Sequence, residues 1–165
     1  FKPQKILLTH SHWDHIADVH PLKEKYQIPV YVHSLDAANL QQPGADALPC
    51  WIPISGVKPD VFLEEGMEVK VGDYRFRILH TPGHSPGCVC FFEPFQYVLF
   101  SGDTLFKGTI GNLSFPTSQP SLMSSSLAKL AQLPPQTRVF PGHGPSTTIQ
   151  AEREWIPDAK KLFNF

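Results

Sequence analysis

Three of the eight histidines in this 165-residue chain fall within six residues, in company with an aspartate. His10, His12, Asp14 and His15 follow directly after the apolar residues 6–8. Alternate residues of an extended chain point to the same side, so His10 and His12 share one side. A turn after the strand would let Asp14 and His15 face a neighbouring point. The spacing therefore predicts two adjacent metal positions.

Three further candidate ligands lie in turns rich in glycine and proline. His84 lies in the sequence TPGHSPG, Asp103 in SGDTLF and His143 in PGHGP. Such turns at strand ends project a side chain into a cleft. Imidazole and carboxylate are ligands that zinc and iron accept. One histidine in a turn of this kind is usually structural, but the joint order and spacing of seven residues argue against that interpretation.

The order His10-x-His12-x-Asp14-His15, followed by His84, Asp103 and His143, resembles the metallo-β-lactamase superfamily. The segments TPGHSPG, SGDTLFKGTIG and PGHGPSTT are similar to its hydroxyacylglutathione hydrolase (glyoxalase II) branch and the short bacterial relatives of that branch. The resemblance covers residues 6 to about 154. It implies an α/β fold, the αββα four-layer sandwich, and a binuclear metal-dependent hydrolase that acts on a small-molecule thioester or related ester.

The resemblance also implies a division of the ligands. His10, His12 and His84 would hold the first metal, Asp14, His15 and His143 the second, and Asp103 would bridge the two. The implied cofactors are two divalent metal ions, with zinc expected and iron or manganese as alternatives. A shared hydroxide would attack the substrate, because two neighbouring cations lower the pKa of the water between them. Asp14, with a spare carboxylate oxygen, is expected to orient that hydroxide and is therefore also a predicted catalytic residue.

Three features depart from the family pattern. The chain begins just before the first histidine motif, so residues 1–165 are expected to form a single metallo-β-lactamase-like domain, with its N-terminal strands either truncated from this sequence or lost with a reduced first sheet. Asn112 occupies the substrate-binding position where the glyoxalase II branch usually has a basic residue. The helical C-terminal domain of the long enzymes is absent from this sequence. We therefore expect weaker binding of glutathione thioesters than in those enzymes.

Two other functions remain open from the sequence. An iron-dependent persulfide dioxygenase uses a similar histidine scaffold for one iron, and a non-catalytic metal-binding protein is the other alternative. Antibiotic hydrolysis is not expected. The β-lactamase branch whose second metal binds a cysteine has that cysteine where this chain has Asp103, and it has an arginine where this chain has His15. RNA-processing enzymes of the ribonuclease Z type share the first motif, but the charge balance of this chain counts against that function.

Composition limits the partners. With 14 Lys and Arg against 15 Asp and Glu, the net charge is -1, so no basic field attracts a phosphate backbone and nucleic acid is not expected as a partner. Apolar runs are far shorter than the roughly 20 residues that span a bilayer, so no membrane association is expected. Three cysteines without a CxxC pair fit a reducing, cytoplasmic location. The oligomeric state is not predicted.

Short apolar strands alternating with short helices indicate an α/β layered domain. Strands are expected at residues 5–8, 29–33, 68–71, 74–79, 88–92, 97–100 and 138–140. Helices are expected at residues 21–26, 35–40, 121–133 and 148–161, the second with Ser34 as its N-cap and the last interrupted by Pro157. Residues 41–59 are interpreted as an irregular loop. Cys88 and Cys90 are assigned to the core, and His20, His33 and His80 match no ligand position.

Overall fold

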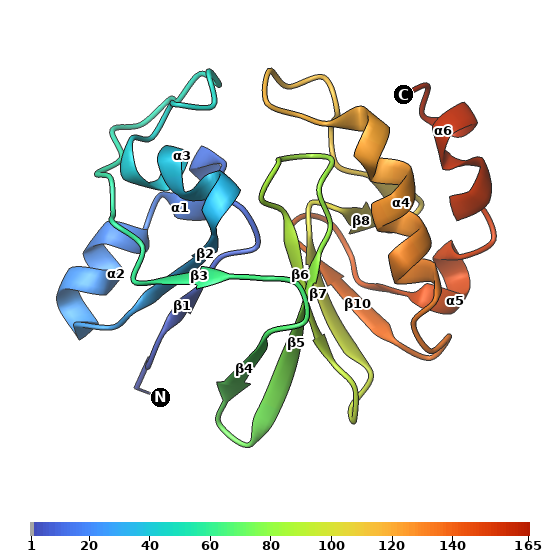
Figure 1. Cartoon of the computed structure of the whole chain (residues 1–165), viewed down its shortest axis with the longest axis horizontal. Helices are drawn as coiled ribbons and strands as arrows, with labels where there is room; N and C mark the ends of the chain where they lie inside the picture. The colour runs from blue at the N-terminus through green and yellow to red at the C-terminus, as the bar shows by residue number, and fades with distance from the viewer. Residues whose placement is uncertain (1) are drawn as a thin grey trace.

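The computed structural model describes residues 2–165 as four layers, in the order helices, sheet, sheet and helices (Figure 1). The smaller sheet is parallel and consists of β1 (Ile6–Leu7), β2 (Val30–His33) and β3 (Val61–Leu63), in that order. Three helices pack on it: α1 (Trp13–Ile16), α2 (Val19–Tyr26) and α3 (Ala37–Gln41). This arrangement confirms the predicted α/β class and the four-layer sandwich.

The larger sheet has six strands in the order β11-β10-β7-β6-β5-β4. Their bounds are β4 (Glu68–Val71), β5 (Tyr74–His80), β6 (Val89–Glu93), β7 (Val98–Gly102), β10 (Arg138–Pro141) and β11 (Thr147–Thr148). A separate hairpin joins β8 (Leu105–Phe106) to β9 (Thr109–Ile110). The outer helical layer contains α4 (Pro120–Ala131), α5 (Ile149–Glu152), the 3₁₀ helix η2 (Ile156–Asp158) and α6 (Ala159–Leu162). Among residues 2–165, no helix is both long and apolar enough to cross a membrane.

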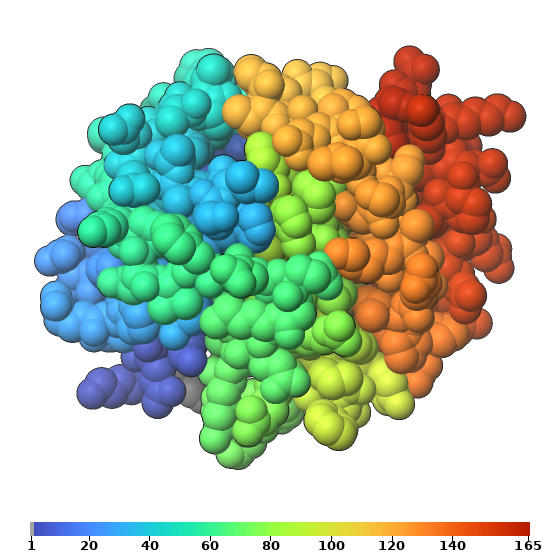
Figure 2. All heavy atoms as spheres, viewed as in Figure 1, coloured from blue at the N-terminus to red at the C-terminus, as the bar shows by residue number. Residues whose placement is uncertain are grey.

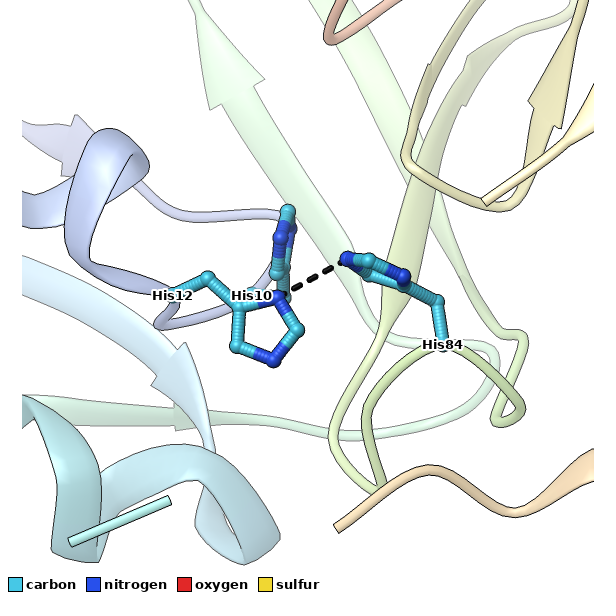
Figure 3. Close-up of side chains that lie close together, drawn as sticks. All are labelled: His10, His12 and His84. Carbon is cyan, nitrogen blue, oxygen red and sulfur yellow. Dashed lines mark hydrogen bonds between the residues drawn. The ribbon is translucent and has the colours of Figure 1, made fainter. Parts of the chain in front are cut away.

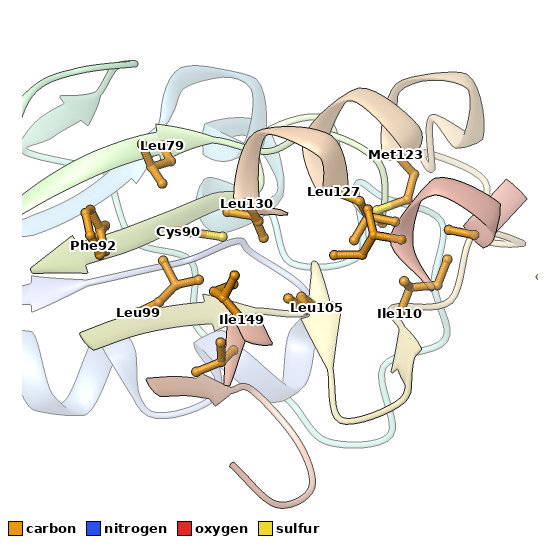
Figure 4. Packing of buried hydrophobic residues seen from close by; sticks show 13 residues of the cluster. Leu79, Cys90, Phe92, Leu99, Leu105, Ile110, Met123, Leu127, Leu130 and Ile149 are labelled. Carbon is orange, nitrogen blue, oxygen red and sulfur yellow. The ribbon is translucent and has the colours of Figure 1, made fainter. Parts of the chain in front are cut away.

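Three apolar clusters hold the layers together. The largest fills the space between the six-stranded sheet and α4, where Met123, Leu127 and Leu130 are fully buried (Figure 4). Their spacing of four and three residues places them on one helix face, as the sequence predicts. A second cluster joins the small sheet to its helices, and a third lies between the two sheets around Ile78 and Val89.

Strand direction explains how distant residues reach one edge. Strands β5 and β7 are both antiparallel to β6, and β10 is parallel to β7, so β5, β7 and β10 run in the same direction. Asp103 follows directly after β7, while His84 and His143 lie in the turns after β5 and β10. The first histidine motif follows β1, and the amide of Val89 donates to the carbonyl of Thr9 at 2.8 Å, which ties the two sheets together at this edge.

The structure corrects several predicted boundaries. Ser34 is not the N-cap of a helix: it begins the 3₁₀ helix η1 (Ser34–Asp36), where the His33 ring accepts from the amide of Leu35. The expected helix over residues 148–161 is instead α5, η2 and α6, because Pro157 has no N–H for a continuous helix. Strands β3, β8, β9 and β11 were not predicted, since two or three residues are too few to show an alternating pattern. The irregular loop after α3 is confirmed.

Candidate metal centre

The seven predicted ligands converge on one site. Their ligand atoms form three groups in which all atoms lie within 4.8 Å of one another: His10 with His12 and His84, His10 with His15 and Asp103, and Asp14 with His15 and His143. The middle group shares His10 with the first group and His15 with the third. The structure therefore brings together every residue that the sequence singled out as a ligand, and their individual roles stay predictions.

The first triad is almost wholly buried. His12 Nδ1 lies 2.8 Å from His84 Nε2, and the ring of His10 stands edge-on to both (Figure 3). The three rings come from two segments, the chain after β1 and the turn after β5. Phe115 packs edge-on against His12 and His84, with ring centroids 5.4 and 5.5 Å away.

The second triad lies nearer the surface. His15 Nε2 is 3.1 Å from His143 Nε2, and His143 Nε2 is 3.1 Å from Asp14 Oδ2. Asp14 and His15 lie on α1, whereas His143 projects from the exposed turn after β10. The second triad, which is the outer one, thus faces solvent, while the first triad, the inner one, is shielded from it.

Asp103 lies between the two triads. Its Oδ2 is 3.5 Å from His84 Nε2 and 3.6 Å from His143 Nε2, and its Oδ1 is 3.5 Å from His15 Nε2. The carboxylate therefore contacts imidazoles of both groups, as a bridging ligand requires. Gly142 makes room for it, because a Cβ there would overlap Asp103 Oδ1.

A backbone carbonyl sets the orientation of His84. The carbonyl oxygen of Asn112 lies 2.8 Å from His84 Nδ1. A carbonyl only accepts, so the proton lies on Nδ1 and the lone pair of Nε2 points toward His12 and Asp103. Gly111 permits this approach, since a Cβ at that position would meet the carbonyl of Asp103 and His84 Nδ1. Sequence reasoning missed this backbone role of Asn112.

Asp36 connects the two segments of the inner triad, and nothing in the sequence marked it. Its Oδ2 accepts from the amide of Ser11 and from the hydroxyl of Ser85, both at 2.9 Å, and its Oδ1 accepts from the amide of Gly87 at 2.6 Å. Ser11 stands between His10 and His12, and Ser85 follows His84. One buried carboxylate thus fixes the spacing between the two ligand segments.

Burial keeps the clustered imidazoles neutral. It lowers the pKa of His12 to about 3 and that of His84 to about 4, and it lowers the pKa of His10 well below the ordinary value. The neighbouring imidazoles act in the same direction, because two adjacent positive charges repel. Burial also raises the pKa of the Asp103 carboxyl to about 6. Neutral imidazoles with free lone pairs are the form that binds a metal.

The donor set fits a pair of divalent metal ions. Within residues 2–165, His10 Nε2, His12 Nε2 and Asp103 Oδ1 are buried without a hydrogen-bond partner. Buried polar atoms are normally paired, so these two imidazole nitrogens and this carboxylate oxygen are most simply explained as ligands of a cation. Imidazole nitrogens and carboxylate oxygens suit zinc or iron.

The remaining predicted residues take other places. Asn112 lines the pocket at the metal centre, and its Oδ1 accepts from the amide of Ser114 at 2.8 Å. Cys88 and Cys90 are buried, as predicted, and burial raises the pKa of both thiols. His33 stacks on His80 with centroids 4.1 Å apart, away from the ligand groups.

A family model described as the metallo-β-lactamase superfamily matches residues 1–143. The chain belongs to the metallo-β-lactamase superfamily. Among curated relatives, it is 35% identical to hydroxyacylglutathione hydrolase GloC of Haemophilus influenzae, over 92% of this chain and 74% of that protein.

Solved structures agree with the fold of this metallo-β-lactamase superfamily member. The B3 metallo-β-lactamase BLEG-1 superposes with a TM-score of 0.87 at 37% identity, over 96% of this chain and 78% of that one. A di-iron-bound form of TTHA1623 superposes with a TM-score of 0.80 at 45% identity, over 91% of this chain and 74% of that one.

Replacing Asp36 with asparagine should loosen the metal centre without touching a ligand. The amide places an NH₂ group against N–H or O–H donors, so we expect the free energy of unfolding to fall by about 2–3 kcal/mol. Metal affinity should fall about 10- to 100-fold, as is typical when a group that orients ligands is lost. Chemical denaturation and metal titration measure the two effects. Asp73→Asn, the same change at an exposed turn, is the control, and equal metal affinities of the two variants would contradict the assigned role.

Acid should destabilise the chelator-treated protein between pH 7 and pH 5. In the unfolded chain a histidine titrates near 6.5, but His12 and His84 bind protons only near pH 3 to 4 when folded. The unfolded state therefore binds more protons in this range, and the free energy of unfolding falls as the pH falls. Two buried carboxyl groups oppose this effect, because burial raises the pKa of Asp103 to about 6 and also raises the pKa of Asp36 in the folded state.

Urea denaturation in the presence of a chelator at pH 7 and pH 5 measures this difference. We expect a loss of about 2–4 kcal/mol, since each buried histidine contributes at most about 1.4 kcal/mol per pH unit. His12→Gln removes one titrating group and should show a smaller loss. Equal or greater stability at pH 5 would contradict the burial of neutral imidazoles.

Proposed function

We propose that this chain is a binuclear metal-dependent hydrolase of the glyoxalase II type, which cleaves a thioester or related ester. Membership of the superfamily and relatives named as probable metallo-hydrolases support metal-dependent hydrolysis. The similarity to hydroxyacylglutathione hydrolase GloC supports a thioester as the substrate class.

The observation on which the proposal rests is the position of Asp103 between two complete triads. One carboxylate approaches imidazoles of both groups at 3.5–3.6 Å, and each triad supplies three further donors. A site for one metal would need only one of these groups. We assign His10, His12 and His84 to the first metal, Asp14, His15 and His143 to the second, and Asp103 to both.

The residues around the ligands contribute the rest of the chemistry. When bound, the two metal ions, zinc or iron, would supply a hydroxide at neutral pH and polarise the substrate carbonyl. Asp14 turns its Oδ2 toward His143 and His15, which leaves Oδ1 to accept a proton from a water and orient it. The carbonyl of Asn112 holds the proton on His84 Nδ1, and Phe115 shields His12 and His84 from water.

Iron is the alternative metal, because the similar protein TTHA1623 has been crystallised in a di-iron-bound form. An iron-dependent persulfide dioxygenase would consume oxygen with glutathione persulfide, whereas a hydrolase releases a thiol without oxygen. β-Lactam hydrolysis is an additional activity to test, because BLEG-1 carries the name of a B3 metallo-β-lactamase. A protein that only binds metal would do none of these.

Asp103→Ala should reduce both the metal content and turnover. With one negative charge fewer between two cations, we expect bound metal to fall from about two ions to about one per chain. Turnover of S-lactoylglutathione or a simple thioester should fall about 100-fold or more, since a metal contributes several kcal/mol to the transition state. Metal content by mass spectrometry and a thiol-release assay measure these changes.

Asp73→Ala, which removes an exposed carboxylate on the β4–β5 turn, serves as the control and should leave both quantities unchanged. Thioester turnover by a metal-replete Asp103→Ala protein at the unmodified rate would contradict the bridging role. Oxygen uptake with a persulfide, in place of thiol release from a thioester, would favour the dioxygenase.

A further inference from the structure

Four apolar side chains line part of the pocket at the metal centre. The pocket encloses about 330 Å³ and, besides the ligands, is lined by Asn112 and by four residues that we call the apolar wall: Trp13, Leu48, Phe106 and Phe115. A volume of this size lies at the small end of ligand pockets, which span roughly 300 to 1,000 Å³. In the space-filling view, the surface is indented between residues 34–50, in blue to teal, and residues 112–125, in orange (Figure 2).

Two members of the apolar wall are anchored close to the ligands. Phe115 contacts His12 and His84 edge-on, and Phe106 stands 6.3 Å from His143, measured between ring centroids. Trp13 lies between His12 and Asp14 in the sequence and begins α1. All four residues of the apolar wall are partly buried, so each still exposes some surface that a bound group could cover.

Leu48 comes from the irregular loop and is held in place by buried polar groups. Its amide donates to Asp46 Oδ1 at 3.0 Å, and Asp46 Oδ2 accepts from Asn39 Nδ2 at 2.9 Å. The same Asn39 amide donates to the carbonyl of Ser11, between two ligands. The chain of contacts fixes Leu48 relative to the metal centre, so this part of the wall is preformed.

The side chains that line the pocket also favour an uncharged substrate group. Of the residues described by the structure, none of those that line this pocket is a lysine or an arginine. Apart from the bound metals, the carboxylates of glutathione would find no cationic side chain there, and Asn112 Oδ1 already accepts from the amide of Ser114. A carboxylate held beyond reach of the metals would lose hydration there without a cationic side chain to compensate.

We infer that the apolar wall selects a small, uncharged, apolar acyl group for the bond that is cleaved, and that Leu48 and Phe115 are specificity-determining residues. This inference rests on the proposed hydrolase function and names its substrate class. Each methylene that the wall removes from water should improve kcat/KM about fourfold, until the pocket is full. A glutathione thioester should be a poorer substrate than a neutral thioester with the same acyl group.

The test compares acetyl, butyryl and hexanoyl esters and thioesters on the metal-loaded protein. We expect kcat/KM to rise from acetyl to butyryl by about tenfold or more, and we expect Leu48→Ser to reduce that ratio. Leu122→Ser, the same change at an exposed position of α4, is the control and should keep it. A ratio near one, or an unchanged ratio in Leu48→Ser, would overturn the inference.

A second variant tests the charge argument. Asn112→Lys places a cation at the rim, so the KM for a glutathione thioester should fall while kcat changes little, as expected for added uniform binding. Tight binding of a glutathione thioester by the unmodified protein would overturn the inference.

A binding measurement separates this inference from the proposed function. Acetamide and hexanamide are titrated against the metal-loaded protein and the Leu48→Ser variant, and their affinities are compared by NMR. Stronger binding of hexanamide that depends on Leu48 supports the apolar wall even if no ester is cleaved. In that case the hydrolase proposal fails and the assignment of the pocket stands. Equal binding of the two amides would overturn the assignment, whatever the turnover.

Discussion

Three imidazoles buried against one another impose the main constraint on this structure. His10, His12 and His84 are nearly inaccessible to water, and His12 and His84 face each other through nitrogens 2.8 Å apart. None of them gains a positive charge at neutral pH, because burial and mutual repulsion lower the pKa of each ring. The Nε2 atoms of His10 and His12 are buried without a hydrogen-bond partner, which is costly unless a cation lies beside them. The surrounding structure must therefore hold the rings rigidly in an arrangement that the polypeptide alone does not favour.

The two sheets satisfy this constraint because they adjoin at one edge, where they hold the rings in place. Strands β5, β7 and β10 run in the same direction and end where the turns bearing His84, Asp103 and His143 begin. The first histidine motif arrives from the other sheet, so the centre lies on a seam between two layers. The hydrogen bond from the Val89 amide to the Thr9 carbonyl and those accepted by Asp36 close that seam beside the ligands. The same buried polar groups continue through Asn39 and Asp46 to the loop that forms part of the pocket.

Sequence reasoning found the ligands because each lies in a local pattern. Histidines spaced by two residues, or placed in Gly-Pro turns after an apolar strand, are recognisable without knowledge of distant contacts. Asp36 escaped notice because its partners lie 25, 49 and 51 residues away, and a lone acid near a helix start resembles an ordinary capping residue. The role of Asn112 toward His84 belongs to its backbone carbonyl, which no side-chain pattern reveals. The apolar wall includes Leu48, from a segment with no periodicity at all. Among the elements, long amphipathic α4 was predictable, whereas the two-residue strands β8, β9 and β11 were not.

The account depends above all on two metal positions that share Asp103. Anomalous diffraction from crystals of the metal-loaded protein, collected at the absorption edge of the bound metal, tests this most directly. We predict two peaks about 3.5–4 Å apart, one among His10, His12 and His84 and one among Asp14, His15 and His143, with the Asp103 carboxylate between them. A single peak in fully loaded crystals, or a metal bound away from these residues, would contradict the account.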